Sequence, residues 1–244
     1  MEDPLLPFYL MKTQHFPCLL ALALALLITD SHAGNPFAKS PEKLDLRIRR
    51  SAERFEALQA EPMKRIPAQL LSRARGIIIL HKVKAGLGIG GEAGNGVAMV
   101  KDPQSGAWSA PAFISSAEGS WGLQIGAKEA TIVMLLMNDA GLKPLIGGSM
   151  NIGVDIEAAA GPNDGGGEID TTTLQSPILV YSNAGGLYAG AAFKGGGIVP
   201  ANKNNNIYYG QTLKQILFDR SARPTASGMA LIQTILNHSG QGRY

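Results

Sequence analysis

The chain has 244 residues, of which 45% are hydrophobic, 17% charged and 6% aromatic, and its net charge is +3. Apolar residues are too frequent and charges too few for an intrinsically disordered chain. The scarcity of aromatic residues argues against a platform for stacking single-stranded nucleic acid. Cys18 is the single cysteine, which excludes an intramolecular disulfide. The 30 glycines, 24 of them within residues 86–197, follow no three-residue period, which excludes collagen and indicates short strands and tight turns.

Residues 1–33 have the features of a secretory signal peptide. The apolar run at residues 18–28 has 11 residues, whereas a bilayer span takes about 20. The sequence SHA, which ends at Ala33, is a small-x-small cleavage site. Residues 1–10 contain Glu2 and Asp3 and make a poor n-region, which favours Met11 over Met1 as the translation start. We therefore expect export and cleavage near Ala33, with an uncleaved N-terminal anchor as the alternative.

Positive charge is concentrated in one part of the mature chain. Residues 34–244 hold 21 basic and 16 acidic side chains, and residues 39–84 alone hold 12 basic and 5 acidic ones. Such an excess predicts an anionic partner. Because a secreted protein seldom meets nucleic acid, we expect a phospholipid or membrane surface and no nucleic acid. The alternative is a charged helix that water solvates.

The first predicted elements are helices. Ser40 and Pro41 suit the cap and the first position of a helix, and apolar residues at helical spacing continue to about Ala60. Residues 34–62 are thus expected to hold an N-terminal amphipathic helix. A second, shorter helix is predicted for residues 68–75.

Strands are predicted next. Residues 77–80, IIIL, and the apolar run at 132–137 predict buried strands, and residues 97–100 predict a further strand after a glycine-rich stretch. Apolar and polar residues alternate at 120–126 and at 150–157, which is typical of strands with one buried and one wet face.

The remaining predictions concern connections and the terminal helices. Polar or turn-forming residues predict connections at 102–106, 161–173 and 202–206, and residues 138–146 predict a short helical or turn connection. Residues 178–181 and 187–193 predict a hairpin, and residues 209–217 and 229–236 predict helices. The order of helices, strands and helices predicts an α+β fold: a strongly curved antiparallel β-sheet or partial barrel, with N-terminal and C-terminal helices packed on it.

Two enzymatic interpretations of the sequence, dinucleotide binding and a hydrolytic triad, both fail. Residues 86–91, GLGIGG, resemble a dinucleotide fingerprint, but that motif must open a helix and here a strand follows. His81 and His238 are the only histidines of the mature chain, and no serine lies in a G-x-S-x-G frame. We therefore expect no enzyme activity and no cofactor.

Carboxylates suggest two further sites. Asp155 and Glu157 would share one face of a strand, where they could act as an acid–base pair but more simply form its wet face. The loop from Asn163 to Asp170 offers oxygen ligands for calcium, although its spacing is not that of an EF-hand. We expect no metal site, and leave cation binding by this loop open.

Several segments, in order, resemble the SYLF domain family of lipid-binding modules over residues 66–218. They are IP at 66–67, GIGGEAGNGV at 88–97, WSAPAF at 108–113, GLQIG at 122–126, AGP at 160–162, YS at 181–182 with GGLYAG at 185–190, and YYG at 208–210. Two features depart from the family: Lys128 precedes Glu129, and NDG follows Gly161-Pro162 where the family often has an arginine.

This resemblance implies a non-enzymatic lipid-binding protein of the cell envelope, with a SYLF-like domain at residues 63–218 and a C-terminal helix at 219–244 packed on it. The signal peptide resembles the secreted or periplasmic branch of the family. The alternative is a structural or protein-interaction module of the envelope, with incidental lipid contact and an unspecified protein partner. The basic residues that flank the domain's opening helix and first strand are the candidates for binding headgroup phosphate: Lys64, Arg65, Arg73, Arg75, Lys82 and Lys84.

Overall fold

The computed structural model describes residues 40–152, 155–162, 175–184 and 197–240. The predicted signal peptide at 1–33, the loop from Asn163 to Asp170 and the second hairpin strand at 187–193 lie outside these residues. Residues Lys39–Tyr244 group into one compact unit. The elements follow one another in the order α2 (Pro41–Ala60), α3 (Ala68–Arg73), β1 (Gly76–Val100), β2 (Ala112–Leu136), α4 (Asp139–Gly147), β3 (Met150–Asn151), β4 (Ala158–Ala160), β5 (Ile178–Ser182), β6 (Gly197–Pro200), α6 (Asn202–Tyr209), α7 (Leu213–Leu217) and α8 (Ala226–His238).

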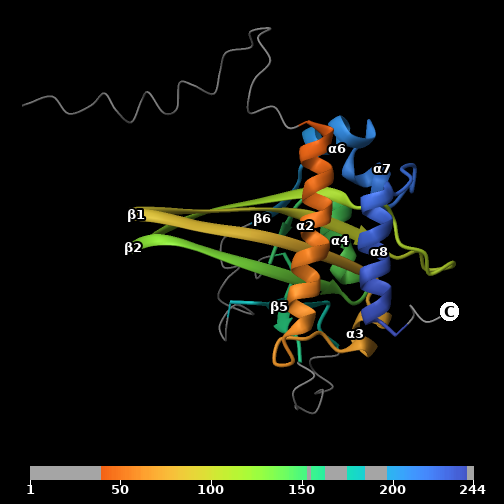
Figure 1. The fold of residues 1–244 in the computed structure, drawn as a ribbon, viewed down its shortest axis with the longest axis horizontal. Coiled ribbons are helices and arrows are strands. Elements are labelled where there is room, and N and C mark those ends of the chain that lie inside the picture. Colours follow the sequence, from red (N-terminus) through yellow and green to blue (C-terminus); the bar gives the residue numbers. More distant parts are fainter. Residues whose placement is uncertain (1–39, 153–154, 163–174, 185–196, 241–244) are drawn as a thin grey trace, which may run out of the picture. The chain divides into compact units, whose positions relative to one another are not determined.

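The N-terminal and C-terminal helices α2 and α8 lie side by side (Figure 1). Pro41 occupies the start of α2, as its fixed φ favours. Leu44, Ile48 and Phe55 recur on one face of α2 and are fully buried. They share a core with Leu231 of α8 and with one face of the sheet, so the prediction of helices packed on the sheet is confirmed.

The strands β1 and β2 form a long antiparallel ribbon that folds over on itself. They pair from Gly76↔Leu136 to Ala98↔Ala112, with an irregularity between Leu87 and Ile89. Both strands run out from the helices and return (Figure 1). The two arms of β1 touch at Gly96, where a side chain would collide with the backbone of Ile79. The glycine-rich stretch is therefore strand, and no helix begins there as a dinucleotide fingerprint would require.

The other strands join β2 at two places. β6 pairs with Ile114 to Ala117, and β5 pairs with Ile132 to Leu136, both antiparallel. β3 pairs with β6, and β4 adds to β5 in parallel orientation. The α+β prediction with a curved sheet is confirmed, with the difference that one short pair is parallel.

The sheet is buried on both faces near the base of the ribbon. Ile77 and Ile79 face the core that contains α2, α3 and α8, whereas Ile78 and Leu80 face the core that contains α4 and α7. This arrangement explains the unbroken apolar run, because a strand covered on both sides has no wet face.

Two predictions about local structure were wrong. The alternating segment at 150–157 is not one strand: Asp155 accepts hydrogen bonds from the backbone and side-chain nitrogens of Asn151, which turns the chain after β3. Asp155 and Glu157 therefore do not share a strand face. The predicted polar loop at 202–206 is helix α6, because the side chain of Asn205 is buried and exchanges two hydrogen bonds with the backbone of Phe113.

The predicted helix at 209–217 is two helices. Gly210 has a positive φ of 69° and ends α6, and α7 then begins behind a Thr212 capping box. Within the part of the chain that the structure describes, no helix is both long and apolar enough to cross a bilayer.

Candidate functional site

The structure does not bring together the six basic residues that the sequence predicted as contacts for headgroup phosphate. Lys82 is only 2% exposed, and its Nζ lies 2.7 Å from Oε1 of Glu92 on the returning arm of β1. The prediction assumed that all six side chains reach the surface, and for Lys82 this is wrong because the folded ribbon encloses it. The side chain of Lys84 lies outside the described part of the structure.

The other four candidates surround the short helix α3. Lys64 pairs with Glu61 at 2.5 Å, and Nε of Arg65 donates to the carbonyl oxygen of Gln59 at 2.8 Å. Arg73 is exposed at the end of α3. Nη1 of Arg75 lies 2.6 Å from Oδ1 of Asp139, and Arg65 and Arg75 line two different cavities.

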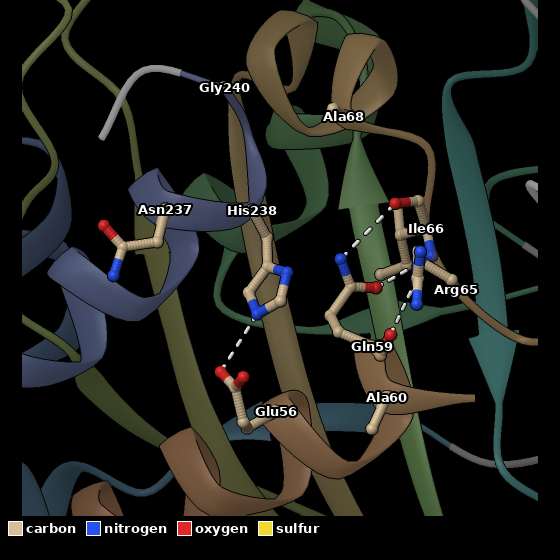
Figure 2. A pocket seen from close by; sticks show the side chains of 9 residues that line it. All are labelled: Glu56, Gln59, Ala60, Arg65, Ile66, Ala68, Asn237, His238 and Gly240. Carbon is tan, nitrogen blue, oxygen red and sulfur yellow. Dashed lines mark hydrogen bonds and ion pairs between the residues drawn. The ribbon is translucent and has the colours of Figure 1, made fainter. Parts of the chain in front are cut away.

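The first of these, the Arg65 cavity, has a volume of about 590 Å³ and lies where the ends of α2 and α8 meet the start of α3. Figure 2 shows its lining residues: Glu56, Gln59, Ala60, Arg65, Ile66, Ala68, Asn237, His238 and Gly240. Nε2 of His238 lies 3.0 Å from Glu56. Gln59 holds the backbone of Ile66 through its side-chain oxygen and nitrogen.

The charges of the Arg65 cavity are already satisfied by protein groups. Glu56 faces His238, and Arg65 is held against the carbonyl of Gln59 (Figure 2). A ligand would have to displace these contacts, and the lining offers few apolar side chains. The cavity is therefore a poor match to an anionic amphiphile.

The second, the Arg75 cavity, has a volume of about 440 Å³ and is lined by residues from β1, the turn after it, α4 and the end of α7. Its lining includes the apolar side chains Val100, Leu142, Ile146, Leu217 and Phe218. It also includes four basic and two acidic side chains: Arg75, Lys101, Lys143, Arg220, Asp102 and Asp139. The lining thus carries an excess of two positive charges beside apolar surface, and Ile146 is 50% exposed.

Protein groups position most of these charges. Nε of Arg220 lies 3.3 Å from Oδ2 of Asp102, and its Nη2 donates to the carbonyl of Ala107 at 3.0 Å. Nζ of Lys101 donates to the carbonyl of Ser72 at 2.8 Å. Burial lowers the pKa of Lys101 from its ordinary value, so an anion that neutralised this cation would favour its charged form.

The sequence missed three of these four cations. Lys101, Lys143 and Arg220 lie in the part of the chain whose net charge is slightly negative, so a charge count directed attention away from them. A local signal was the position of Lys101, at a strand end directly before the predicted turn. No local sequence signal indicated Arg220, which pairs with Asp102 of the turn although the two residues are 118 positions apart.

A third cavity of about 240 Å³ contains His81. Nε2 of His81 lies 3.7 Å from Oε2 of Glu129. Burial first, and then the charge of Arg54, lower the pKa of His81, which favours the neutral form of the ring. Among the residues that the structure describes, no three His, Cys, Asp or Glu side chains gather so that they could hold a metal ion.

Comparison with known proteins gives matches over most of the chain. Residues 117–238 match the Ysc84 family, described as "Las17-binding protein actin regulator". The SH3 domain-containing YSC84-like protein 1 of Xenopus laevis is 30% identical over 67% of this chain and 50% of its own length. Its Homo sapiens counterpart is 30% identical over 67% of this chain and 48% of its own length.

Protein YSC84 of Saccharomyces cerevisiae is 32% identical over 66% of this chain and 36% of its own length. The chain therefore spans about half the length, or less, of the curated relatives it matches. No solved structure shows a significant match.

Proposed function

This chain belongs to the Ysc84 family, the family that its SYLF motifs resemble, and we propose that it is a non-enzymatic module that binds anionic phospholipid. The observation that supports the proposal is the Arg75 cavity. A phospholipid presents a negatively charged phosphate next to an apolar chain, and this cavity places an excess of positive charge next to apolar side chains.

The two arginines of the cavity suit phosphate better than lysines would, because a guanidinium donates two parallel hydrogen bonds to one phosphate. Arg75 and Arg220 each pair with a single carboxylate, on Asp139 and Asp102. Asp139 is largely exposed, so Arg75 can exchange that pair for a headgroup at small cost. We add Lys101, Lys143 and Arg220 to the predicted site, and retain Lys64 and Arg73 as outer contacts.

Charge reversal of Lys143 tests this site, because Lys143 is exposed on α4 and its replacement leaves the core intact. Lys143→Glu removes one attraction and adds one repulsion at the membrane. Since a basic residue near an anionic surface contributes about 1 kcal/mol, binding should weaken at least about fivefold. Flotation with phosphatidylcholine vesicles that contain increasing phosphatidylserine measures the change.

Lys203→Glu is the matched control. It makes the same charge change on the exposed face of α6, away from the cavity, and should reduce binding less. Equal losses in the two variants would show that net charge, and not the Arg75 cavity, drives binding. Wild-type binding should also fall with added salt, because screening shortens the reach of exposed charges.

A second candidate function is protein interaction. The family's description as "Las17-binding protein actin regulator" favours it. In this alternative the chain is a structural or interaction module and lipid contact is incidental. A wild-type chain that fails to float with anionic vesicles at low salt, yet forms a stable protein complex, would establish it.

Export is part of the proposal. The apolar run at 18–28 and the cleavage sequence that ends at Ala33 support secretion or delivery to the periplasm. Sequencing of the exported protein should find Gly34 at or near its N-terminus. A mature chain that keeps Met11 would refute cleavage.

A further inference from the structure

One side of helix α2 carries three arginines, which we call the arginine row: Arg47, Arg50 and Arg54. They stand at positions i, i+3 and i+7 of the helix, so their side chains leave it on the same side. Arg50 is exposed, and Arg47 and Arg54 are half-buried. Within the described part of the chain, none of the three forms an ion pair.

Other charges of α2, away from the arginine row, do have partners. Nε of Arg49 lies 3.2 Å from Oδ2 of Asp45, and Glu56 pairs with His238 of α8. Figure 1 shows that α8 lies along one side of α2 and that the β1–β2 ribbon runs out on the other. The charges that face α8 are therefore satisfied within the molecule.

The arginine row lies in the corner between α2 and the sheet. Cζ of Arg47 is 5.7 Å from the centroid of the Phe113 ring of β2. Arg54 lines the cavity of about 240 Å³ that contains His81 of β1, together with Asn183 after β5. The row thus borders a polar hollow on the face of the sheet that α2 covers.

Protein anions compensate the charge of the row incompletely. Nη1 of Arg47 is buried and has no hydrogen-bond partner among the described residues, and burial lowers the pKa of Arg47. Burial first, and then the charge of Arg50, lower the pKa of Arg54, although Glu129 and Glu53 act in the opposite direction. An anion along the row would favour the charged forms, because an opposite charge offsets both burial and mutual repulsion.

The surroundings of the row favour an acidic protein segment over a bilayer. Glu129 lines the same cavity as Arg54 and is 71% exposed. Anionic headgroups would meet this carboxylate as well as the arginines, whereas a polypeptide can present its carboxylates to the arginines alone. None of the large apolar side chains that the described residues expose belongs to α2 or to this cavity. The site therefore offers neither insertion into lipid nor the apolar anchors that hold a docked helix.

The spacing of the row suits an extended segment. From Arg50 to Arg54 the helix rises about 6 Å at ~1.5 Å per residue. Residues i and i+2 of an extended chain point the same way and lie about 6.6 Å apart at ~3.3 Å per residue. Two acidic side chains at alternate positions can therefore reach both arginines, and each guanidinium can donate two parallel hydrogen bonds to a carboxylate.

We propose that the arginine row docks an extended segment of a partner protein that carries acidic side chains at alternate positions. The proposal goes beyond phospholipid binding, needs no membrane, and gives the second candidate function a defined surface. The row and the Arg75 cavity can act independently, because they lie on opposite faces of the sheet. α2 belongs to the core on one face, and Val100 and Leu142 of the cavity belong to the core on the other.

A fluorescein-labelled peptide in which glutamate alternates with serine tests the proposal, with fluorescence anisotropy measured against the full chain. The same peptide with glutamine in place of glutamate should not bind. Arg50→Gln should weaken binding of the glutamate peptide about threefold, and Arg50→Gln combined with Arg54→Gln about tenfold, since one exposed ion pair contributes up to about fivefold.

Arg49→Gln is the matched control, because it removes the same charge from the same helix on the side that faces Asp45, and Arg49 is 57% exposed. It should leave peptide binding within about twofold, since salt screens a charge that does not contact the peptide. Lys143→Glu, at the Arg75 cavity, should also leave peptide binding unchanged. Circular dichroism verifies the fold of every variant.

The outcomes separate this proposal from the proposed function. Absence of wild-type binding to the glutamate peptide at low salt, or equal weakening by Arg49→Gln and Arg50→Gln, would overturn docking at the row and leave phospholipid binding intact. In flotation with phosphatidylserine vesicles, the double variant should bind like the wild type. Loss of flotation with unchanged peptide binding would show that the row is a membrane contact and would also overturn the proposal. Failure of the wild type to float would overturn the proposed function alone.

Discussion

At the scale of single residues, Asp45 connects three helices. Its carboxylate accepts hydrogen bonds from Tyr208 of α6 at 2.6 Å and from Ser227 of α8 at 2.8 Å. Burial by itself would raise the pKa of Asp45, but these two hydrogen bonds and the charge of Arg49 together lower it. On the partner, burial first and then the hydrogen bond to Asp45 raise the pKa of Tyr208 to about 12.

Asp45→Asn should therefore lower the free energy of unfolding by about 1–3 kcal/mol at neutral pH, since hydrogen bonds to charged groups are the stronger ones. The folded-state pKa of Asp45 is lowered from 3.8. Its contribution is thus complete above 3.8 and is lost as the pH falls through the lowered pKa. Urea denaturation at neutral and acidic pH should show the wild type and the variant converging in acid. The exposed Asp219 gives the control, and Asp219→Asn should cost less than about 0.5 kcal/mol.

At the scale of elements, the folding-over of β1 depends on glycine where its two arms cross. A Cβ at Gly96 would collide with the carbonyl oxygen of Ile79, which is backbone and cannot rotate away. This close approach explains why the stretch contains glycine although glycine weakens a strand in general.

Gly96→Ala should accordingly cost at least about 1–3 kcal/mol, the usual penalty of overpacking. Gly147→Ala is the matched control, because nothing lies within 4 Å of a Cβ at that position in α4, and alanine is the better helix former by about 0.5–1 kcal/mol. Thermal denaturation compares the two. Equal stability of Gly96→Ala and the wild type would contradict the close packing of the arms.

At the scale of the whole molecule, the two ends of the described chain share one core. Phe55 of α2 is fully buried and packs edge-on against the ring of His238 at the end of α8, with 5.8 Å between ring centroids. Glu56 pairs with the same histidine. The N-terminal helix and the C-terminal helix should therefore unfold together with the sheet and not as separate units.

Phe55→Ala should reduce the free energy of unfolding by about 3–5 kcal/mol and keep a single transition. Circular dichroism follows the helices, and tryptophan fluorescence follows the sheet core through Trp108. Met229→Ala, at a half-exposed position of α8, should change stability little. Transitions that separate between the two probes would show that the helices and the sheet are independent.

Local sequence signals determined the elements whose stabilising contacts are local or periodic. Pro41 and the helical spacing of apolar residues predicted α2 to its end at about Ala60. The IIIL run predicted a buried strand, which the structure covers on both faces. The turn at 102–106 formed as predicted, with Asp102 accepting hydrogen bonds from the backbone of Gln104 and Ser105. In each of these, the residues that fix the conformation lie within a few positions of one another or repeat with one period.

Only the tertiary structure decided which charged side chains are exposed to a ligand and which of them lie together. Lys82 looked like a surface cation, but the fold of the ribbon brings Glu92 to it and removes both from water. The Arg75 cavity gathers cations from positions as distant as Lys101 and Arg220. Asn205, in a stretch whose polar sequence predicted a loop, lies in helix α6 and exchanges two hydrogen bonds with the backbone of Phe113, 92 residues away. These outcomes depend on long-range pairing, and a hydrogen bond or ion pair between distant residues leaves no periodic trace in either segment.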